Sequence, residues 1–187
     1  YEVIGISPNG RRLVKDALEL KPDLIVLDIA MPELNGLEAA AQLRHLLPRT
    51  HLVFVTQTVD PYYARAAFRA GAIGYVAKQS GRDELLAALR RALHGRIYLS
   101  PLLRDAFPQL SLGDLRSSGE TLANELTPRQ REVLQMVAEG RTVKEISTAL
   151  KISPKTVEFH KNALMNETGL RTTADLTRYA ISRGVIS

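Results

Sequence analysis

Three polar side chains in the first half of the chain each follow a short apolar run, and together they could handle a phosphoryl group. Asp28, Thr56 and Lys78 stand at the ends of runs rich in Val, Ile and Leu. If these runs are parallel strands, the side chains lie at the edge of the sheet where α/β proteins bind ligands. An aspartate there can attack phosphorus, while a lysine and a threonine can bind the transferred oxygens. Each residue alone would also fit a turn or a solvated strand end, so both interpretations stay open.

Residues in the last third of the chain are of types that could contact the phosphates and base edges of DNA. Residues 142–161 fit a helix, a tight turn and a second helix, the arrangement whose second helix enters the major groove. Lys and Thr suit phosphates, Asn162 could read an adenine edge, and Phe159 could contact a thymine methyl group. Ser153 begins the second helix, whose N-terminus itself attracts a phosphate. The candidates on this helix are Ser153, Lys155, Thr156, Glu158, Phe159, His160, Lys161 and Asn162.

Two alternatives remain open for this segment. Capped helices with a solvated basic face would form an ordinary four-helix bundle with the same pattern. His160 could donate to a phosphate or be a half-buried helix histidine, and no second ligand stands at helical spacing from it to hold a metal. The predicted core of this segment consists of Ile146, Leu150, Ile152, Val157 and Leu164.

Alternating apolar runs and amphipathic stretches predict the framework that positions the first group of residues. The candidate strands are residues 3–6, 24–27, 52–56 and 74–77, and the candidate helices are residues 10–20, 36–46, 61–70 and 82–93. Short buried runs that alternate with helices at this spacing are typical of a parallel α/β sheet.

A linker and a helical domain are predicted to follow. Pro, Gly and Ser break the pattern between residues 100 and 125, although residues 101–107 could still form a helical turn or two. Thr127, Thr142 and Ser153 are predicted to cap helices that end near residues 139, 150 and 168, and Thr172 or Thr173 starts a fourth. The predicted organisation is therefore an α/β domain at 1–99, a linker at 100–125 and an all-α domain at 126–187.

Composition excludes several classes of protein. The 187 residues contain no Cys, which excludes a disulfide scaffold, a thiolate zinc site and a catalytic thiol. They also contain no Trp and few aromatic residues, so a stacking platform for single-stranded nucleic acid is not expected. No apolar run approaches the roughly 20 residues of a membrane span, and the start of the chain has no signal-peptide pattern. We expect a soluble, cytoplasmic protein. Residues 126–187 hold ten basic and six acidic side chains, so most of the net charge of +5 lies there. A compact basic domain suggests a polyanion partner, although many solvated surfaces are mildly basic too.

The helical segment resembles a known DNA-binding family. Leu126-Thr-Pro-Arg-Gln-Arg-Glu-Val-Leu, Lys144-Glu-Ile and Ile152-Ser-Pro-Lys-Thr-Val-Glu-Phe-His-Lys look like the LuxR-type DNA-binding domain. The resemblance implies phosphate contacts for Lys144, Lys155, Thr156 and Lys161, and base contacts for Glu158, Phe159 and Asn162. Relatives often carry a basic residue at the Glu158 or Asn162 position. Relatives also often have Arg or Lys where this chain has Asn166 and Glu167, so the target sequence stays open.

The first half resembles a bacterial receiver domain. Pro22-Asp-Leu-Ile-Val-Leu-Asp-Ile-Ala-Met-Pro looks like the phosphoacceptor segment, and Ala70-Gly-Ala-Ile-Gly-Tyr-Val-Ala-Lys like the segment with the receiver lysine. The whole chain thus resembles a NarL/FixJ-type response regulator with a flavodoxin-like receiver. The resemblance implies that Asp28 accepts phosphate from a histidine kinase, that Thr56 and Tyr75 switch, and that Lys78 pairs with the phosphoryl oxygens. Asp28 and the carbonyl of Ala30 would contribute to a Mg²⁺ site.

The sequence departs from the receiver pattern at its start. A receiver has five strands, and residues 1–6 align with the second of them, so about one strand–helix unit of roughly thirty residues is missing together with the acidic pair after the first strand. That strand would lie between residues 1–6 and 24–27. Three explanations for this departure stay open. The sequence given lacks residues that the protein has, or the sheet is rearranged or completed by a partner subunit, or the receiver is a degenerate dimerisation module. Mg²⁺ is expected only if an acidic pair exists upstream.

These observations predict a homodimeric, DNA-binding transcriptional response regulator without enzymatic activity, controlled by phosphorylation of Asp28, by dimerisation, or by both. Its expected partners are duplex DNA, a histidine kinase and RNA polymerase. Three alternatives remain: a phosphorylation-independent regulator with a pseudo-receiver, an adaptor whose helices bind protein, and a standalone phosphatase or transferase that uses Asp28.

Overall fold

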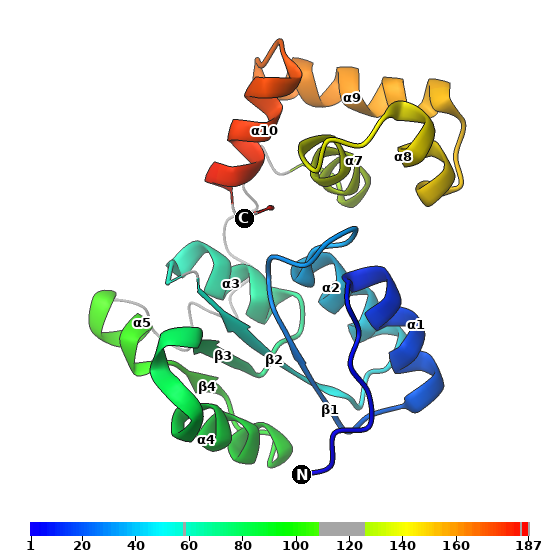
Figure 1. Ribbon diagram of the computed structural model, residues 1–187. Coiled ribbons are helices and arrows are strands. Elements are labelled where there is room, and N and C mark those ends of the chain that lie inside the picture. The colour runs from blue at the N-terminus through cyan, green and yellow to red at the C-terminus, as the bar shows by residue number, and fades with distance from the viewer. Residues whose placement is uncertain (58, 109–125, 184, 187) are drawn as a thin grey trace.

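The computed structural model describes residues 1–57, 59–108, 126–183 and 185–186, which form an α/β domain and a helical domain (Figure 1). The α/β domain contains β1 (Leu24–Leu27), β2 (His51–Thr56), β3 (Gly74–Ala77) and β4 (Tyr98–Leu99), together with α1 (Gly10–Leu20), α2 (Gly36–Leu46), α3 (Pro61–Arg69), α4 (Gly81–Leu93) and α5 (Pro101–Ala106). The helical domain contains α7 (Pro128–Ala138), α8 (Val143–Leu150), α9 (Pro154–Thr168) and α10 (Thr173–Ser182).

The strands form one parallel sheet in the order β1-β2-β3-β4. Successive residues of a strand face opposite sides of a sheet. Accordingly, Phe54 of β2 packs with Leu43 and Phe68 in the core beneath α1, α2 and α3, while Val53 packs with Ala88 beneath α4 on the other face. The sheet is therefore covered by helices on both sides, as the α/β prediction requires.

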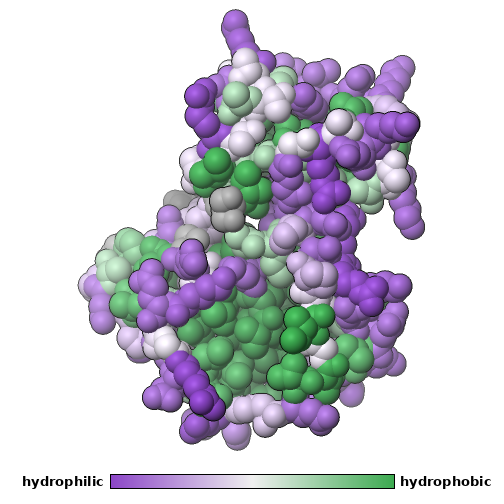
Figure 2. Space-filling view, in the orientation of Figure 1, coloured by the Kyte–Doolittle hydropathy of each residue, from purple (hydrophilic) through white to green (hydrophobic). Residues whose placement is uncertain are grey.

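The prediction of a strand at residues 3–6 is wrong in this structure. The segment is extended but unpaired, and Val3 and Ile6 are 79% and 88% exposed. A strand needs a neighbour for its backbone groups, and β1 pairs only with β2 within the described residues. Val26 in β1 is consequently 44% exposed. An apolar hollow of about 790 Å³ separates β1 from residues 3–6 (Figure 2).

The end of the first domain also differs from the predicted boundary. The sequence places residues 100–125 in a linker, whereas α5 directly follows β4 and its Leu103 is buried in the core with Tyr75. Apolar packing therefore keeps residues 101–107 with the first domain. Residues 109–125 lie outside the described part of the chain.

Capping residues define the helical domain as predicted. Thr127 and Thr142 each form a capping box with the Gln130 or Glu145 side chain, and Ser153 accepts from the backbone N–H of Thr156. These contacts satisfy N–H groups that a helix start leaves free. Of the predicted core residues, Ile146, Leu150, Val157 and Leu164 are buried, and Ile152 packs against them partly exposed. Among the described helices, none is long and apolar enough to cross a membrane.

Candidate phosphoacceptor site and DNA-contacting helix

The sheet brings the three candidate phosphoryl-binding residues to neighbouring strand ends. Asp28 follows β1, Thr56 ends β2, and Lys78 follows β3, with Thr56 paired in register with Ala77. Lys78 Nζ lies 2.5 Å from Asp28 Oδ2, and the Ile29 N–H donates to Asp28 Oδ1 at 2.7 Å. The Asp28 side chain is 25% exposed, so a reagent can reach the carboxylate from solvent.

The backbone around Asp28 is tightly packed. A Cβ on Gly36, the first residue of α2, would lie 1.9 Å from the carbonyl oxygen of Asp28. Only a glycine allows this approach, which lets the Gly36 N–H donate to the Ile29 carbonyl at 2.8 Å. Asn35 caps α2 through its side chain. The start of α2 therefore fixes the backbone that carries the carboxylate.

Tyr75 occupies a different environment from the other candidates. Its ring is 1% exposed in β3 and belongs to the core beneath α1, α2 and α3. Burial raises the pKa of the Tyr75 hydroxyl far above its usual value, and the negative charges of Asp60 and Asp28 act in the same direction. Tyr75 is therefore a neutral core side chain behind the strand ends.

The described residues do not by themselves make a magnesium site. Mg²⁺ requires octahedral oxygen ligands and usually takes one or two carboxylates. Within the described part of the chain, no group of three His, Cys, Asp or Glu side chains is placed to hold a metal. Asp28 offers one carboxylate, already paired with Lys78, and Ala30 offers a carbonyl. These two residues fit part of such a site and need further ligands.

The α9 helix presents one solvent-facing stripe in the helical domain. Lys155, Glu158, Phe159 and Asn162 are all exposed, and their spacing of three and four residues places them on one face. Phe159 is 68% exposed, although it is large and apolar. Val157 and Leu164 hold the opposite face in the core. In Figure 1, α9 lies on the side of its domain away from the sheet, so this stripe is accessible.

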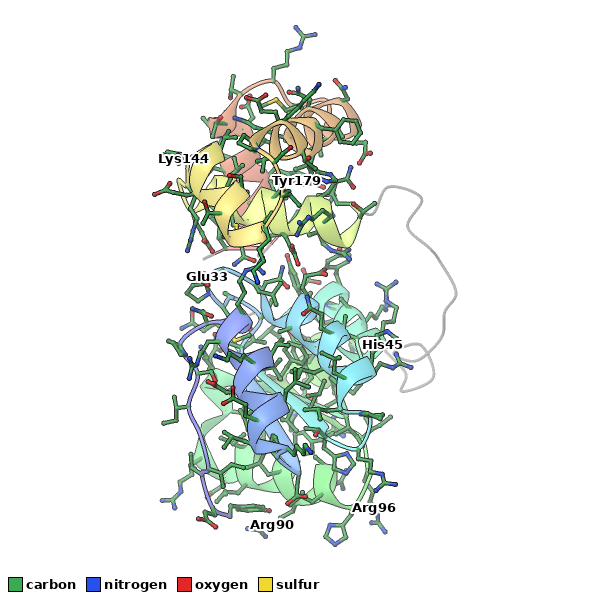
Figure 3. All side chains as sticks on the ribbon, turned by 90° about the vertical axis from the view of Figure 1, so that its right-hand side faces the viewer. Glu33, His45, Arg90, Arg96, Lys144 and Tyr179 are labelled. Atoms are coloured by element: carbon green, nitrogen blue, oxygen red, sulfur yellow. The ribbon has the colours of Figure 1, made fainter. Side chains whose placement is uncertain are left out.

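The remaining DNA-contact candidates lie beside this stripe. The Ser153 and Thr156 hydroxyls are 2.8 Å apart at the start of α9, and Lys161 Nζ donates to Thr173 Oγ1 at 3.2 Å. The half-buried His160 packs its ring edge to face with Phe159, at 5.6 Å between centroids. Lys144 is exposed on α8 (Figure 3). The structure thus gathers the candidates on α9, and Lys144 contributes from the neighbouring helix.

A group of residues that the sequence did not single out joins the two domains. Gln135 of α7 is 1% exposed; its Oε1 accepts from the Asn35 N–H at 2.8 Å, and its Nε2 donates to the Met31 carbonyl at 2.7 Å. Glu139 accepts from the Glu33 N–H at 3.0 Å. Figure 3 shows Glu33 at the boundary between the domains. The loop that follows Asp28 is therefore hydrogen-bonded to the helical domain.

An ion pair extends this interface onto α2. Arg131 Nε donates to Glu38 Oε1 at 2.5 Å, and the Glu38 side chain is 8% exposed. Burial raises the pKa of Glu38, and the Arg131 guanidinium offsets part of that shift. Arg131, Gln135 and Glu139 are spaced four residues apart, so they form a polar stripe along α7. That stripe is the one signal in the sequence from which the interface could have been found.

Comparisons with known proteins agree with both halves of the chain. Residues 1–90 match the response regulator receiver domain, and residues 124–180 match the bacterial regulatory proteins of the luxR family. The transcriptional regulatory protein MctR of Rhizobium johnstonii is 31% identical, over 100% of this chain and 84% of that protein. The response regulator GacA of Pseudomonas aeruginosa is 30% identical, over 99% and 86%.

Solved structures show the same fold. The RcsB response regulator of Salmonella typhimurium, solved in a study of its DNA interaction, is 22% identical and superposes with a TM-score of 0.63 over 97% of this chain and 84% of RcsB. The receiver match, the luxR-family match and two relatives at 30% identity or more agree with the geometry of both domains. This chain therefore belongs to the NarL/FixJ-type response regulators, DNA-binding transcription regulators in which a receiver domain precedes a LuxR-type helix-turn-helix domain.

Proposed function

We propose that Asp28 is the phosphoacceptor of this regulator and that its modification controls DNA binding by the helical domain. The observation that carries the proposal is the 2.5 Å pair between Lys78 Nζ and Asp28 Oδ2 at the carboxyl ends of neighbouring strands. In the proposed step, an Asp28 oxygen attacks the phosphorus of a phosphohistidine on a histidine kinase, and the imidazole leaves as the new P–O bond forms. Lys78 and Thr56 then bind the phosphoryl oxygens.

The loop after Asp28 supports a link between this step and the helical domain. Glu33 in that loop has a positive φ of 65°, a strained conformation for a residue with a side chain, and its N–H is held by Glu139. A phosphoryl group on Asp28 adds negative charge and competes for Lys78 and the Ile29 N–H. We infer that this loop then shifts and releases α7, with Thr56 and Tyr75 as switch residues behind it.

On the DNA side, the exposed stripe of α9 supports a direct role in the major groove. We propose base contacts for Glu158, Phe159 and Asn162 and phosphate contacts for Lys144, Lys155, Thr156 and Lys161, with Ser153 and His160 at the margin of the contact. A homodimer would place two α9 helices on half-sites about one helical turn apart. RNA polymerase is a further proposed partner. The proposed role is regulatory rather than enzymatic, and it belongs in the cytoplasm, where the DNA target lies.

Magnesium enters the proposal conditionally. Asp28 and Ala30 form part of a site, and further acidic residues must join them before Mg²⁺ can be held there. When bound, the ion would neutralise phosphoryl charge beside Asp28. The residues of this chain supply the attacking carboxylate and the Lys78 cation in either case.

Intact-mass measurement after incubation with a small phosphodonor tests the acceptor assignment. We expect the wild-type protein to gain the mass of one phosphoryl group and the Asp28→Asn variant to gain none. Asp23→Asn is the matched control, because Asp23 is an exposed aspartate at the start of β1, and it should react like the wild type. An adduct that persists in Asp28→Asn would move the acceptor elsewhere.

A phosphorylation-independent regulator is the second candidate function. The observation that favours it is the single carboxylate that the described residues offer at the metal position. In that case the phosphodonor changes neither the mass nor the DNA affinity of the wild-type protein, and the receiver serves only to hold two copies together. An adduct on Asp28 combined with altered DNA affinity would exclude this candidate.

The phosphate contacts can be tested by fluorescence anisotropy with labelled duplexes. Lys161→Ala should weaken binding to all duplexes similarly, because a phosphate contact carries no sequence information. It should also lower the slope of log affinity against log salt by about one. Lys15→Ala on α1 makes the same charge change at an exposed position of the receiver and serves as the control. A loss confined to one sequence would contradict the phosphate assignment of Lys161.

A further inference from the structure

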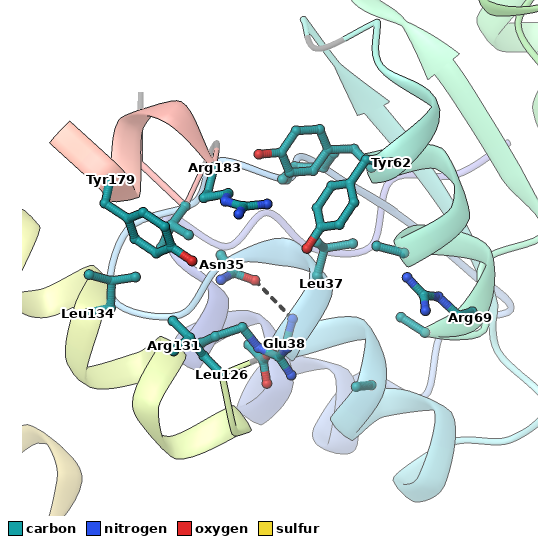
Figure 4. A pocket seen from close by; sticks show the side chains of 16 residues that line it. Asn35, Leu37, Glu38, Tyr62, Arg69, Leu126, Arg131, Leu134, Tyr179 and Arg183 are labelled. Atoms are coloured by element: carbon teal, nitrogen blue, oxygen red, sulfur yellow. Dashed lines mark hydrogen bonds and ion pairs between the residues drawn. The ribbon is translucent and has the colours of Figure 1, made fainter. Parts of the chain in front are cut away.

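A cavity of about 480 Å³ lies between the two domains and has no role in the function proposed above (Figure 4). Its walls come from α2 and α3 of the receiver and from α7 and the end of α10 in the helical domain. Small-molecule sites have volumes of about 300–1,000 Å³ and occur preferentially at domain interfaces. The size and the position of this cavity are therefore those of a ligand site.

The cavity combines apolar and aromatic walls. Leu37, Leu126 and Leu134 line it together with the rings of Tyr62, Tyr63 and Tyr179. Tyr62 and Tyr63 pack edge to face with their centroids 5.1 Å apart. Walls of this kind favour a planar aromatic group, because ring pairs gain energy beyond the burial of their area.

Two polar groups of the wall are available to a ligand. The Tyr63 hydroxyl is buried in a residue that is 6% exposed, and it makes no hydrogen bond to the described residues. Arg183 is exposed to solvent, its guanidinium stands over the Tyr179 ring at 5.3 Å, and no salt bridge joins it to a carboxylate of the described residues. Arg131, by contrast, is occupied by Glu38. A buried donor that faces a cavity and has no protein acceptor is a group that a polar ligand can satisfy.

The protonation state of Tyr63 agrees with a donor role. Burial raises the pKa of its hydroxyl to about 12, while the nearby Arg183 charge acts in the opposite direction. Tyr63 therefore keeps its proton at neutral pH and can donate to an anion. Tyr63 and Arg183 come from different domains, and both line the cavity.

We propose that this cavity binds a small aromatic carboxylate, with the ring among the tyrosines and the carboxylate between the Arg183 guanidinium and the Tyr63 hydroxyl. Inorganic phosphate fits less well, because it leaves the apolar walls without a partner. A ligand that touches both walls binds the closed arrangement of the domains more tightly than an open one, and it stabilises that arrangement by mass action. The aromatic carboxylate is thus a second input to the regulator, at a site separate from Asp28, and it opposes the release of α7.

Isothermal titration calorimetry of the whole chain with benzoate tests the proposal. Benzoate should bind saturably. Benzamide, which has the same shape but no charge, should bind at least ten-fold more weakly, because hydrogen bonds to charged groups are the stronger ones. Arg183→Gln should lower benzoate affinity roughly ten-fold or more, and Tyr63→Phe roughly three- to ten-fold. Arg178→Gln is the matched control, since Arg178 lies on the same helix and pairs with Asp175 away from the cavity.

Three outcomes would overturn the proposal. These are benzoate binding that fails to saturate at millimolar concentration, equal affinities for benzoate and benzamide, and equal effects of the Arg183 and Arg178 variants. Thermal unfolding of each variant without ligand separates loss of the site from loss of the fold. Because Asp28 lines no part of the cavity, Asp28→Asn should bind benzoate like the wild type, which keeps this test independent of the phosphoacceptor assignment.

Discussion

Replacing Gln135 with leucine should open the two domains. The substitution removes two hydrogen bonds that cross the interface, from the Asn35 N–H and to the Met31 carbonyl, and a third to Glu139, which caps the end of α7. A neutral hydrogen bond contributes about 0.5–1.5 kcal/mol, and a buried group left without its partner costs about 1–3 kcal/mol. In the closed state, the two cross-domain groups would lose about 2–6 kcal/mol together. That loss shifts the closed-to-open ratio by a factor between roughly thirty and roughly ten thousand.

The absence of native cysteine makes this shift measurable. Cysteines placed at the exposed positions His45 on α2 and Thr148 on α8 can carry spin labels, one on each domain. Pulsed electron paramagnetic resonance should show a single narrow distribution of distances between the two labels in the wild type. The distribution in Gln135→Leu should be broader and shifted to longer distances. Gln42→Leu on the exposed face of α2 makes the same chemical change outside the interface and should leave the distance unchanged. An unchanged distribution in Gln135→Leu, with normal thermal unfolding, would refute the energetic role of these contacts.

Three further predictions concern the interface, the loop after Asp28 and the exposed stripe of α9. Burial raises the pKa of Glu38 in the closed state above its ordinary value of 4.5. Protonation of Glu38 therefore stabilises the closed state below pH 4.5, and this stabilisation is lost as pH rises through the raised pKa. Arg131→Gln removes the offsetting charge and should destabilise the closed state relative to the open state by about 1–3 kcal/mol at pH 7. The effect should become smaller as pH falls, and the distance between the spin labels would measure it. Gly36→Ala puts a Cβ 1.9 Å from the Asp28 carbonyl and should lower the free energy of unfolding by several kcal/mol, about 3 or more, in urea titration. Phe159→Ala should leave stability unchanged and reduce only sequence-specific DNA affinity, by about 1 kcal/mol in anisotropy measurements.

Each of these predictions has a matched control and a contradicting result. The double variant Glu38→Gln with Arg131→Gln removes the buried charge, so its domain opening should not vary with pH in this range; an equal loss at pH 5 and pH 7 in Arg131→Gln alone would contradict the ion-pair argument. Gly140→Ala meets no atom within 4 Å and should cost only about 1–2 kcal/mol for its positive φ. If it costs as much as Gly36→Ala, the close approach to Asp28 does not explain the latter. Equal loss on random and specific duplexes would contradict base contact by Phe159.

Local signals in the sequence predicted most of the elements and the residues at their ends. Three of the four candidate strands and all the candidate helices are present, and most of their ends lie within one residue of the predicted position. The reason is that short Val, Ile and Leu runs and Ser or Thr caps act through their immediate neighbours. The same locality explains the juxtaposition of Asp28 with Lys78, since parallel strands align their carboxyl ends. It also explains the α9 stripe, which follows from helical spacing alone.

Tertiary structure decided what depends on partners distant in the sequence. Residues 3–6 have a strand-like pattern and remain unpaired because no neighbour lies beside them, and Leu103 joins the first core although its surroundings read as a linker. The docking of α7 on the loop after Asp28 joins residues about one hundred positions apart, so the polar stripe of α7 marks a contact surface in the sequence but does not specify its partner. The sequence by itself determined which polar residue types stand at the strand ends and along one face of α9. Only the packing of the domains decided that Gln135 holds the loop after Asp28 and that Tyr63 and Arg183 line one cavity, because such contacts depend on how whole surfaces fit together.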